Sequence, residues 1–180
     1  IRDRDESTVV IWTSDNGAPR RNPPQGSNGP LAGWGYTTAE GGMRVPCLMR
    51  WPGRIPAGTV CDQLSTMMDM LPTFARLADA EKLPTTPVDG NNILPLMLGK
   101  PGAKTPHEAF YYYRLDQLQA VRAGKWKLYV NPGATPSGRL YDVVNDPGET
   151  TDLAAKSPAV VKRLAMLADA AREELGDKGK

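Results

Sequence analysis

Two apolar runs stand out in the first third of the chain. The first, Val9-Val10-Ile11-Trp12, is rich in β-branched and aromatic residues and shows no alternation with polar positions. Such a run predicts a strand over residues 8–13 that is buried on both faces, as in a parallel sheet. The second run covers residues 45–51 and predicts another core strand, which the Pro52-Gly53 turn ends.

Apolar residues recur at helical spacing in two further segments. Residues 69–80 predict a helix with Asp69 as its N-cap and Pro72 in its first turn. The last helix is predicted to begin at Ser157 and Pro158, the N-cap and the first helical position. The expected buried face of the first helix consists of Leu71, Phe74, Ala75 and Ala78, and that of the last helix of Val160, Val161, Leu164, Leu167, Ala168, Ala171 and Leu175.

Four short strands are predicted between these two helices, over residues 109–114, 118–122, 126–130 and 140–143, with a tight turn at Asp146-Pro147-Gly148. The last helix would pack on their sheet and complete a small α+β unit with four antiparallel strands. The charged residues Arg122, Lys125 and Lys127 are interpreted as outward-facing strand charges, because alternate positions of a strand with one buried face point to water.

The chain is expected to belong to the α/β class and to divide into two domains. Residues 81–107 are rich in proline and are interpreted as a crossing linker. Residues 1–100 would be part of a larger α/β sheet domain, and residues 101–180 a small C-terminal α+β domain. The single histidine, His107, is interpreted as a loop residue at the entrance of a strand.

Composition excludes little beyond a few partner classes. The 180 residues are 40% hydrophobic and 23% charged, which is typical of an ordinary globular protein. A net charge of +2 gives no reason to expect nucleic acid or an anionic membrane as partner, and no segment reaches the ~20 apolar residues that span a bilayer. Cys47 and Cys61 lack zinc-site spacing and are expected to be two small buried thiols rather than a disulfide.

Polar residues follow the first strand directly, as Ser14-Asp15-Asn16-Gly17. This is the strand end at which α/β sheets bind their ligands, and adjacent Asp and Asn offer two hard oxygens to Ca²⁺ or Mg²⁺. Asp-Asn-Gly is also ordinary turn chemistry, so spacing alone leaves a plain turn and a metal site open. Residues 18–36, rich in proline and glycine, predict a long irregular loop of the kind that lines sites.

Further motifs change that balance. The segment TTAEGGMRVP at residues 37–46 and Trp51-Pro52-Gly53, taken together with SDNG, resemble the sulfatase family of the alkaline-phosphatase-like superfamily. The later segments DMLPTFARLA, VDGNNILPLMLGK, LQAVRAGKWKLY and LYDVVNDPGETTDLA are similar to the rest of a sulfatase's C-terminal half, in the same order. The segments SNGPL and FYYYR favour the arylsulfatase and N-acetylgalactosamine-6-sulfatase group.

The resemblance implies a bound Ca²⁺, with Mg²⁺ as the alternative, for which Asp15 is the charged ligand and Asn16 a neutral oxygen ligand. It also implies a formylglycine nucleophile made in a Cys/Ser-x-Pro-x-Arg motif, and neither cysteine nor any serine of this chain has that setting. We therefore expect no catalytic residue here. The nucleophile is expected in an N-terminal part of the same enzyme, which would also be the partner of this chain.

One departure from the family concerns a lysine that contacts the sulfate. Alignment on Leu31 and on Thr37-Thr38 places that lysine at Gly35. Arg20 and Arg21 are the nearest cations in sequence, and they are either solvated loop charges or anion contacts beside the metal. Because a guanidinium can grip two sulfate oxygens at once, both arginines are candidate substrate-binding residues.

The predicted function is that of the C-terminal part of a calcium-dependent sulfatase acting on aryl or carbohydrate sulfate esters. The chain alone would be inactive. The alternatives are a phosphodiesterase or phosphonate hydrolase of the same superfamily, and a non-catalytic fragment or pseudo-enzyme. The expected partners are a sulfated small molecule or carbohydrate, without nucleic acid or membrane, and the family leads us to expect the periplasm, the exterior or the lysosome.

Overall fold

The computed structural model describes residues 7–21, 26–80, 86–131 and 138–178. Contacts divide the chain into two compact units, each discontinuous in sequence. Unit 1 combines Ile1–Trp12 with Cys47–Glu108, and unit 2 combines Thr13–Pro46 with Ala109–Lys180. The expected domain boundary at residue 100 stays a prediction.

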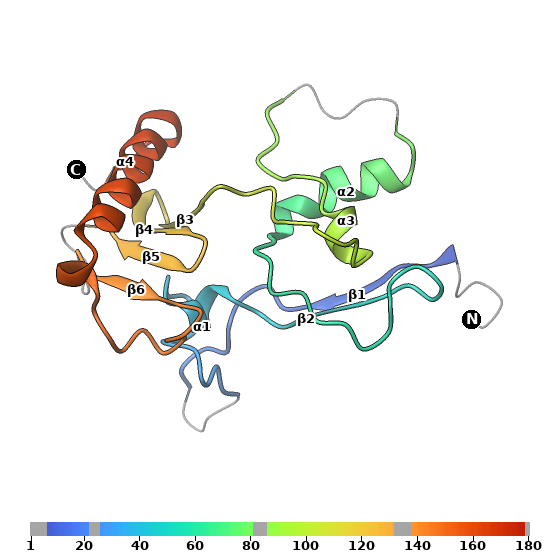
Figure 1. The fold of residues 1–180 in the computed structure, drawn as a ribbon, viewed down its shortest axis with the longest axis horizontal. Coiled ribbons are helices and arrows are strands. Elements are labelled where there is room, and N and C mark those ends of the chain that lie inside the picture. The colour runs from blue at the N-terminus through green and yellow to red at the C-terminus, as the bar shows by residue number, and fades with distance from the viewer. Residues whose placement is uncertain (1–6, 22–25, 81–85, 132–137, 179–180) are drawn as a thin grey trace. The chain divides into compact units, whose positions relative to one another are not determined.

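Unit 1 is built around a small apolar core (Figure 1). Strand β1 (Val10–Thr13) pairs with β2 (Cys47–Arg50) in a two-stranded sheet. The 3-10 turn η2 (Met67–Asp69) continues into α2 (Met70–Leu77), and α3 (Leu94–Met97) follows. The core consists of buried Ile93, Leu96 and Met97, against which Val9, Ile11, Met49, Ile55, Met70 and Ala103 pack.

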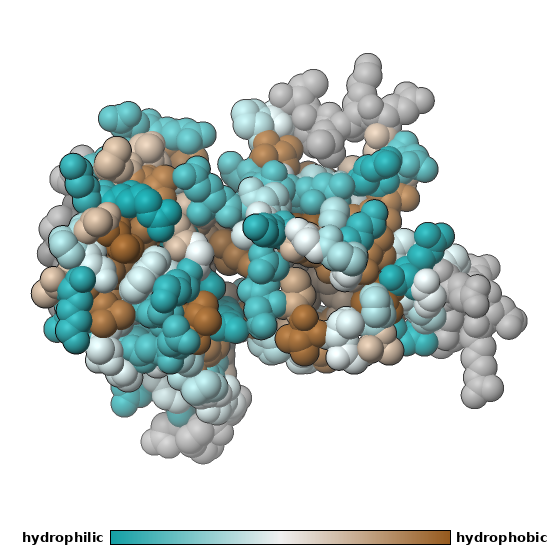
Figure 2. All heavy atoms as spheres, in the orientation of Figure 1, coloured by the Kyte–Doolittle hydropathy of each residue, from teal (hydrophilic) through white to brown (hydrophobic). Residues whose placement is uncertain are grey.

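The strand predicted at residues 8–13 is confirmed as β1, but its burial on both faces is not found within the described part of the chain. Ile11 packs into the core, whereas Val10 is 49% exposed and Trp12 is 58% exposed. The strand has one paired neighbour and one packed face, so its exposure alternates. Figure 2 shows hydrophobic residues, in brown, at the surface among hydrophilic ones, in teal.

The helix predicted at residues 69–80 exists as α2, but its predicted apolar face is wrong. Pro72 and Thr73 are the buried residues, whereas Leu71 is 51% exposed and Phe74 is 44% exposed. A polar contact accounts for this orientation. The Thr73 hydroxyl accepts a hydrogen bond from the Ile93 amide at 3.0 Å, which turns this side of the helix inward. Asp69 occupies the N-cap position of α2, as predicted, but its carboxylate makes no capping hydrogen bond to that helix and instead accepts the Thr66 amide at 2.7 Å in a capping box around η2.

The expectation of two buried thiols is also wrong. Cys47 and Cys61 are both exposed, and they form no disulfide. Cys47 lies on β2, of which only Met49 is half-buried, and Cys61 lies in a stretch of exposed loop. Small apolar side chains are buried only where a neighbouring element covers them.

Unit 2 contains an antiparallel sheet in the order β3-β4-β5-β6. All four predicted strands are confirmed, as β3 (Phe110–Arg114), β4 (Gln117–Ala123), β5 (Trp126–Tyr129) and β6 (Leu140–Asp142). The predicted turn after β6 is confirmed too, since the Glu149 amide donates to the Asp146 carbonyl at 3.1 Å.

Helix α4 (Pro158–Leu175) follows the short turn η3 (Ala154–Lys156) and covers one face of this sheet (Figure 1). Leu164, Ala168 and Ala171 are its buried residues, and they pack on apolar side chains of β4, β5 and β6. The predicted stripe is confirmed except at its end, where Leu175 is 53% exposed. Among the described helices none combines the length and apolar character that crossing a membrane requires.

The opposite face of the sheet is covered as well, and this overturns the outward placement of two strand charges. Arg122 is 8% exposed and Lys127 is 0% exposed, because the carboxylates of Glu40 and Glu149 lie over them. Only Lys125, at the turn between β4 and β5, keeps a largely accessible side chain, which pairs with a β6 carboxylate. Glu40 belongs to the short helix α1 (Glu40–Met43), so this face of the sheet holds the segment that follows the candidate loop.

Candidate metal and anion site

The proposed metal ligands lie in a turn directly after β1, at residues 14–17, which we call the ligand turn. The Asp15 carboxylate accepts the Asn16 amide at 2.8 Å through Oδ1, and the Asn16 side-chain amide donates to the Gly17 carbonyl at 2.8 Å. The Ser14 hydroxyl donates to the Asn16 carbonyl at 2.9 Å, which tightens the turn. Asp15 is exposed and Asn16 is half-buried. Among the described residues, none bonds to Asp15 Oδ2 or to Asn16 Oδ1, so each side chain keeps an oxygen for a ligand.

Asn28 organises the loop that follows. Its side-chain oxygen accepts the Ala18 amide at 2.7 Å, and its nitrogen donates to the Ala18 carbonyl at 2.9 Å and to the Gly33 carbonyl at 3.3 Å. Within residues 18–21 and 26–36 the loop has no helix or strand, as predicted. One polar side chain therefore bonds the start of the loop to a segment near its end.

The two arginines predicted to contact the anion lie at the start of this loop. Arg20 and Arg21 are both exposed. Nothing in the structure tests their role in substrate binding, which stays a prediction.

Gly17 and Gly35 allow backbone to pack on backbone behind the ligand turn. The Gly17 amide donates to the Gly42 carbonyl at 3.0 Å, and a Cβ at Gly17 would lie 1.7 Å from the Gly41 carbonyl oxygen. A Cβ at Gly35 would lie 2.2 Å from the Gly17 carbonyl oxygen and 3.2 Å from Asn16 Nδ2. Since real Cβ atoms do not approach so closely, only glycine fits these contacts. The ligand turn is thereby packed directly between Gly35 and α1.

A buried carboxylate fixes α1 in turn. Glu40 is 0% exposed and accepts three hydrogen bonds from the sheet. Tyr112 donates its hydroxyl to Oε1 at 2.8 Å, Lys127 donates to Oε1 at 3.1 Å, and Arg122 donates to Oε2 at 3.0 Å. A buried carboxylate is stable only with such full partnering, so α1 has a single favourable position on the sheet.

A second carboxylate completes the network from the turn after β6. Glu149 Oε1 accepts the Glu40 backbone amide at 2.7 Å and the Lys127 ammonium at 3.2 Å, while its other oxygen accepts the Tyr129 hydroxyl. Lys127 also donates to the Thr38 carbonyl at 2.7 Å. Two carboxylates thus face Lys127 and Arg122, and their charges balance in a space closed to water.

The two phenols of this network stay protonated donors. Burial, and then the negative charge of Glu40, raise the pKa of Tyr112 well above its usual range. Burial and the Glu149 carboxylate likewise raise the pKa of Tyr129. Both hydroxyls therefore keep, at neutral pH, the proton that they donate to a carboxylate.

Little in the sequence indicates this network. Arg122 and Lys127 alternate along strands as solvent-facing charges would, and their partners are distant in sequence, 82 residues for Arg122 and 87 for Lys127. The one available signal is Glu40 itself, a charged residue between alanine and two glycines.

The donor chemistry of the ligand turn fits a hard divalent cation. A carboxylate and an amide oxygen on adjacent residues are ligands that Ca²⁺ accepts, but Ca²⁺ takes six to eight oxygens in all. In the described residues no three His, Cys, Asp or Glu side chains gather as a metal-binding group. The assignment of Asp15 and Asn16 as metal ligands therefore stays a prediction.

A separate polar cluster lies in unit 1. His107 Nε2 lies 2.8 Å from Asp69 Oδ1 and 3.0 Å from Oδ2, and the same carboxylate accepts the amides of Thr66 and Asn91. His107 is a loop residue, as expected, but its side chain is only 8% exposed. All these hydrogen bonds of the Asp69 carboxylate connect segments of unit 1, so we assign the Asp69–His107 pair a structural role.

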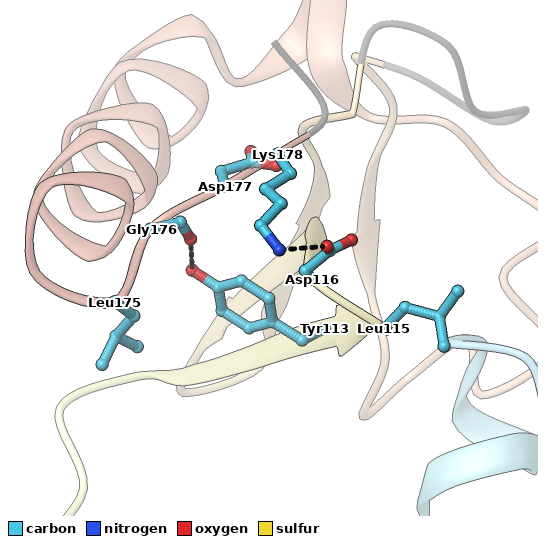
Figure 3. A pocket seen from close by; sticks show the side chains of 7 residues that line it. All are labelled: Tyr113, Leu115, Asp116, Leu175, Gly176, Asp177 and Lys178. Carbon is cyan, nitrogen blue, oxygen red and sulfur yellow. Dashed lines mark hydrogen bonds and ion pairs between the residues drawn. The ribbon is translucent and has the colours of Figure 1, made fainter.

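An open hollow of about 450 Å³ lies at the far end of unit 2, between the β3–β4 turn and the end of α4 (Figure 3). Tyr113 donates its hydroxyl to the Gly176 carbonyl at 2.9 Å across it, and Lys178 pairs with Asp116 at 3.2 Å. None of the residues predicted for the site lines this hollow, and its polar side chains already have partners, which for Asp177 is Arg172 at 2.9 Å.

Comparison with known proteins places the chain. A family model for the C-terminal region of N-sulphoglucosamine sulphohydrolase matches residues 36–173. N-acetylgalactosamine-6-sulfatase of Canis lupus familiaris is 46% identical over 126 residues, which is 69% of this chain and 24% of that protein. Arylsulfatase A of Homo sapiens is 35% identical over 192 residues, covering 90% of this chain and 37% of that protein.

The fold agrees with these relatives. The crystal structure of PsFucS1 sulfatase from Pseudoalteromonas sp. matches with a TM-score of 0.83 at 23% identity, covering 98% of this chain and 40% of that one. The predicted α/β fold class, the C-terminal part of an alkaline-phosphatase-like domain with a four-stranded antiparallel sheet and a last helix, is confirmed. The chain spans less than half the length of each of these proteins. It belongs to the sulfatase family and corresponds to the C-terminal part of its members.

Proposed function

We propose that the full-length protein is a calcium-dependent sulfatase in which Asp15 and Asn16 supply two of the metal ligands. The observation that carries the proposal is the ligand turn itself. Each of its two side chains has an oxygen to which no described residue donates a hydrogen bond, while Gly17 is packed tightly against α1 and Gly35. A rigid turn that presents oxygens outward is what a cation site needs.

Sulfate ester hydrolysis places negative charge on the sulfate oxygens and on the leaving oxygen. A bound divalent cation supplies charge neutralisation for those oxygens. Asp15 contributes the negative charge that holds a cation, and Asn16 contributes a neutral oxygen. The bond from the Asn16 amide nitrogen to the Gly17 carbonyl fixes the plane of that side chain, which limits the rotamers lost on binding.

The nucleophile of the reaction is proposed to be a formylglycine in the preceding part of the full-length protein. No Cys/Ser-x-Pro-x-Arg motif occurs in these 180 residues, and both cysteines lie outside the ligand turn and its loop. We therefore expect this chain by itself to hydrolyse no sulfate ester. From the family we propose the periplasm, the exterior or the lysosome as its location.

Two exposed aromatic residues support a ring-bearing alcohol as the leaving group. Trp34 and Tyr36 flank Gly35, which contacts the ligand turn, and they are 37% and 71% exposed. Tyr36 has a φ of 70°, which is strained for a residue with a side chain. Because the side chain is exposed, packing does not stabilise this conformation. Aromatic faces beside the metal turn suit an aryl group or a sugar ring. One relative, N-acetylgalactosamine-6-sulfatase, is named for a sulfated sugar.

The test uses the full-length protein with three substrates: an aryl sulfate, a 6-sulfated N-acetylhexosamine and an aryl phosphonate monoester. We expect turnover of a sulfate ester that is lost on chelation and restored by Ca²⁺. Asp15→Ala should lower kcat/KM by at least ~10³-fold, since the loss of one charged transition-state contact costs about 4 kcal/mol. Preference for the phosphonate would assign the protein to another activity of the superfamily, and no turnover of any substrate would favour a non-catalytic protein.

A further inference from the structure

The ligand turn has no side chain of its own that reaches the sheet of unit 2. It is bonded through backbone to α1, by the Gly17 amide to the Gly42 carbonyl at 3.0 Å, with the Gly41 carbonyl packed against Gly17. Any displacement of α1 must therefore displace Gly17 and with it the neighbouring Asn16 and Asp15. The position of the ligand oxygens depends on the position of α1.

Helix α1 cannot hold that position by itself. It has four residues, and its N-cap residue, Ala39, provides no side-chain hydrogen bond. A helix of one turn is unstable in isolation, because nucleation fixes several dihedral angles for a single hydrogen bond. The cap comes instead from the Glu149 carboxylate on the Glu40 amide, 2.7 Å away.

The contacts of Glu40 with three strands fix the position of α1 on the sheet. Its two carboxylate oxygens take donors from three strands, namely Tyr112 of β3, Arg122 of β4 and Lys127 of β5. Because Glu40 and Lys127 are both completely buried, water cannot substitute for a lost partner. A shift of α1 along the sheet would lengthen several charge-assisted hydrogen bonds together.

We propose that Glu40, held by Tyr112, Arg122, Lys127 and Glu149, is a positioning residue for the metal site, through which the C-terminal sheet sets the geometry of Asp15 and Asn16. The proposal rests on the proposed function, since it takes these two residues as calcium ligands. Glu40 is buried and cannot touch a substrate, so its effect passes through α1 and Gly17.

The experiment compares matched substitutions in the full-length protein, with calcium affinity measured by calorimetry after chelation. Glu40→Gln has as its control Asp142→Asn, which also converts a buried, lysine-paired carboxylate of unit 2 into an amide, without a described contact to α1. Tyr112→Phe has as its control Tyr141→Phe, another buried tyrosine of the same cluster. All proteins are measured at a temperature at which thermal unfolding shows them folded.

We expect Glu40→Gln to weaken calcium binding about tenfold and Tyr112→Phe about threefold, while both controls stay within about twofold of wild type. The kcat of Glu40→Gln should recover toward wild type at raised Ca²⁺, which a general loss of structure would not allow. Unchanged calcium affinity in Tyr112→Phe, or in folded Glu40→Gln, would overturn the proposal. If Glu40→Gln does not fold, Tyr112→Phe against Tyr141→Phe decides.

Failure of the proposed function gives a different result. If wild-type protein binds no calcium, the metal assignment of Asp15 and Asn16 is wrong, and the positioning role falls with it. If wild-type protein binds calcium and the variants bind it equally well, the metal assignment stands and only the positioning role is wrong.

Discussion

The carboxylate of Glu149 accepts a hydrogen bond from the backbone amide of Glu40 at 2.7 Å, although 109 residues separate the two in sequence. Glu149 itself adopts a φ of 50°, in the left-handed region that non-glycine residues seldom occupy. A strained turn is thus maintained where its side chain caps α1, neutralises Lys127 and accepts the Tyr129 hydroxyl. Removing the Glu149 side chain should therefore lower the protein's stability, because several contacts are lost at once.

Glu149→Ala should destabilise the protein by about 3 kcal/mol, because it leaves a buried lysine short of one carboxylate and α1 without its cap. The measurement is the free energy of unfolding in urea for the full-length protein. Glu174→Ala, at an exposed position of α4, is the control and should lie within about 0.5 kcal/mol of wild type. Equal stabilities of the two variants would contradict the network.

Gly35→Lys should strongly lower activity rather than place a cation beside the sulfate. A Cβ at residue 35 would lie 2.2 Å from the Gly17 carbonyl oxygen, so any side chain must push the ligand turn away. We expect kcat/KM to fall at least ~100-fold for Gly35→Lys and for Gly35→Ala alike, with weaker calcium binding in both. Gly29→Ala is the control, because the nearest atom to its Cβ would be 3.4 Å away. Raised activity in Gly35→Lys would show that the turn can yield.

Arg20→Ala or Arg21→Ala should reduce kcat/KM at least ~tenfold in the full-length enzyme, which corresponds to about 1.4 kcal/mol of transition-state stabilisation. The reason is that Gly35 offers the sulfate no cation, while these two exposed guanidinium groups begin the loop after the ligand turn. Arg76→Ala, a surface arginine of α2 paired with Asp79, is the control. Wild-type kcat/KM in both loop variants would make the two arginines solvated charges.

Asp142 should make stability depend on acid pH. Burial works to raise its pKa, but the Lys125 ammonium at 2.6 Å and hydrogen bonds from Asn145 outweigh burial and lower the pKa from 3.8 to about 2. The stabilisation is therefore complete above pH ~4 and is lost as the pH falls from about 4 to 2, because the unfolded chain binds the proton first; it amounts to at most about 2 kcal/mol.

The measurement is the free energy of unfolding of wild type and Asp142→Asn between pH 2 and pH 6. The difference between the two proteins should be constant above pH ~4 and should shrink toward pH 2. A difference that does not change with pH would show that the carboxylate has the same pKa in the folded and unfolded chain.

Local patterns predicted the C-terminal half of unit 2 well. The alternating strands and the stripe of α4 report a face that packs on its immediate neighbours, and four strands and a helix appear where the sequence placed them. The pattern failed where a distant segment covers a surface. Arg122 and Lys127 look solvent-facing along their strands, and only Glu40, far away in the chain, makes their burial possible.

The same reason explains the errors in unit 1. An apolar periodicity assigned Leu71 and Phe74 to the core, but the hydroxyl of Thr73 bonds to Ile93 and turns the other side of α2 inward. Within the candidate site, Asp15 and Asn16 were proposed as ligands from their residue types and their place after a strand, and the structure confirms only that they lie in a turn directly after β1. The glycine contacts that hold them could not be predicted, since close approach of two backbones leaves no mark in hydropathy.

The partners of Glu40 also fix an order of events during synthesis. Tyr112, Arg122, Lys127 and Glu149 all follow it in the chain, and its carboxylate cannot be buried before they are available. A ribosome makes the ligand turn more than a hundred residues before it makes the last of these supports, and contacts so distant in sequence form slowly. The nascent chain therefore has Asp15 and Asn16 outside the tunnel long before their geometry is set, and truncation ahead of Glu149 would release a protein with both ligands and no stable place for them.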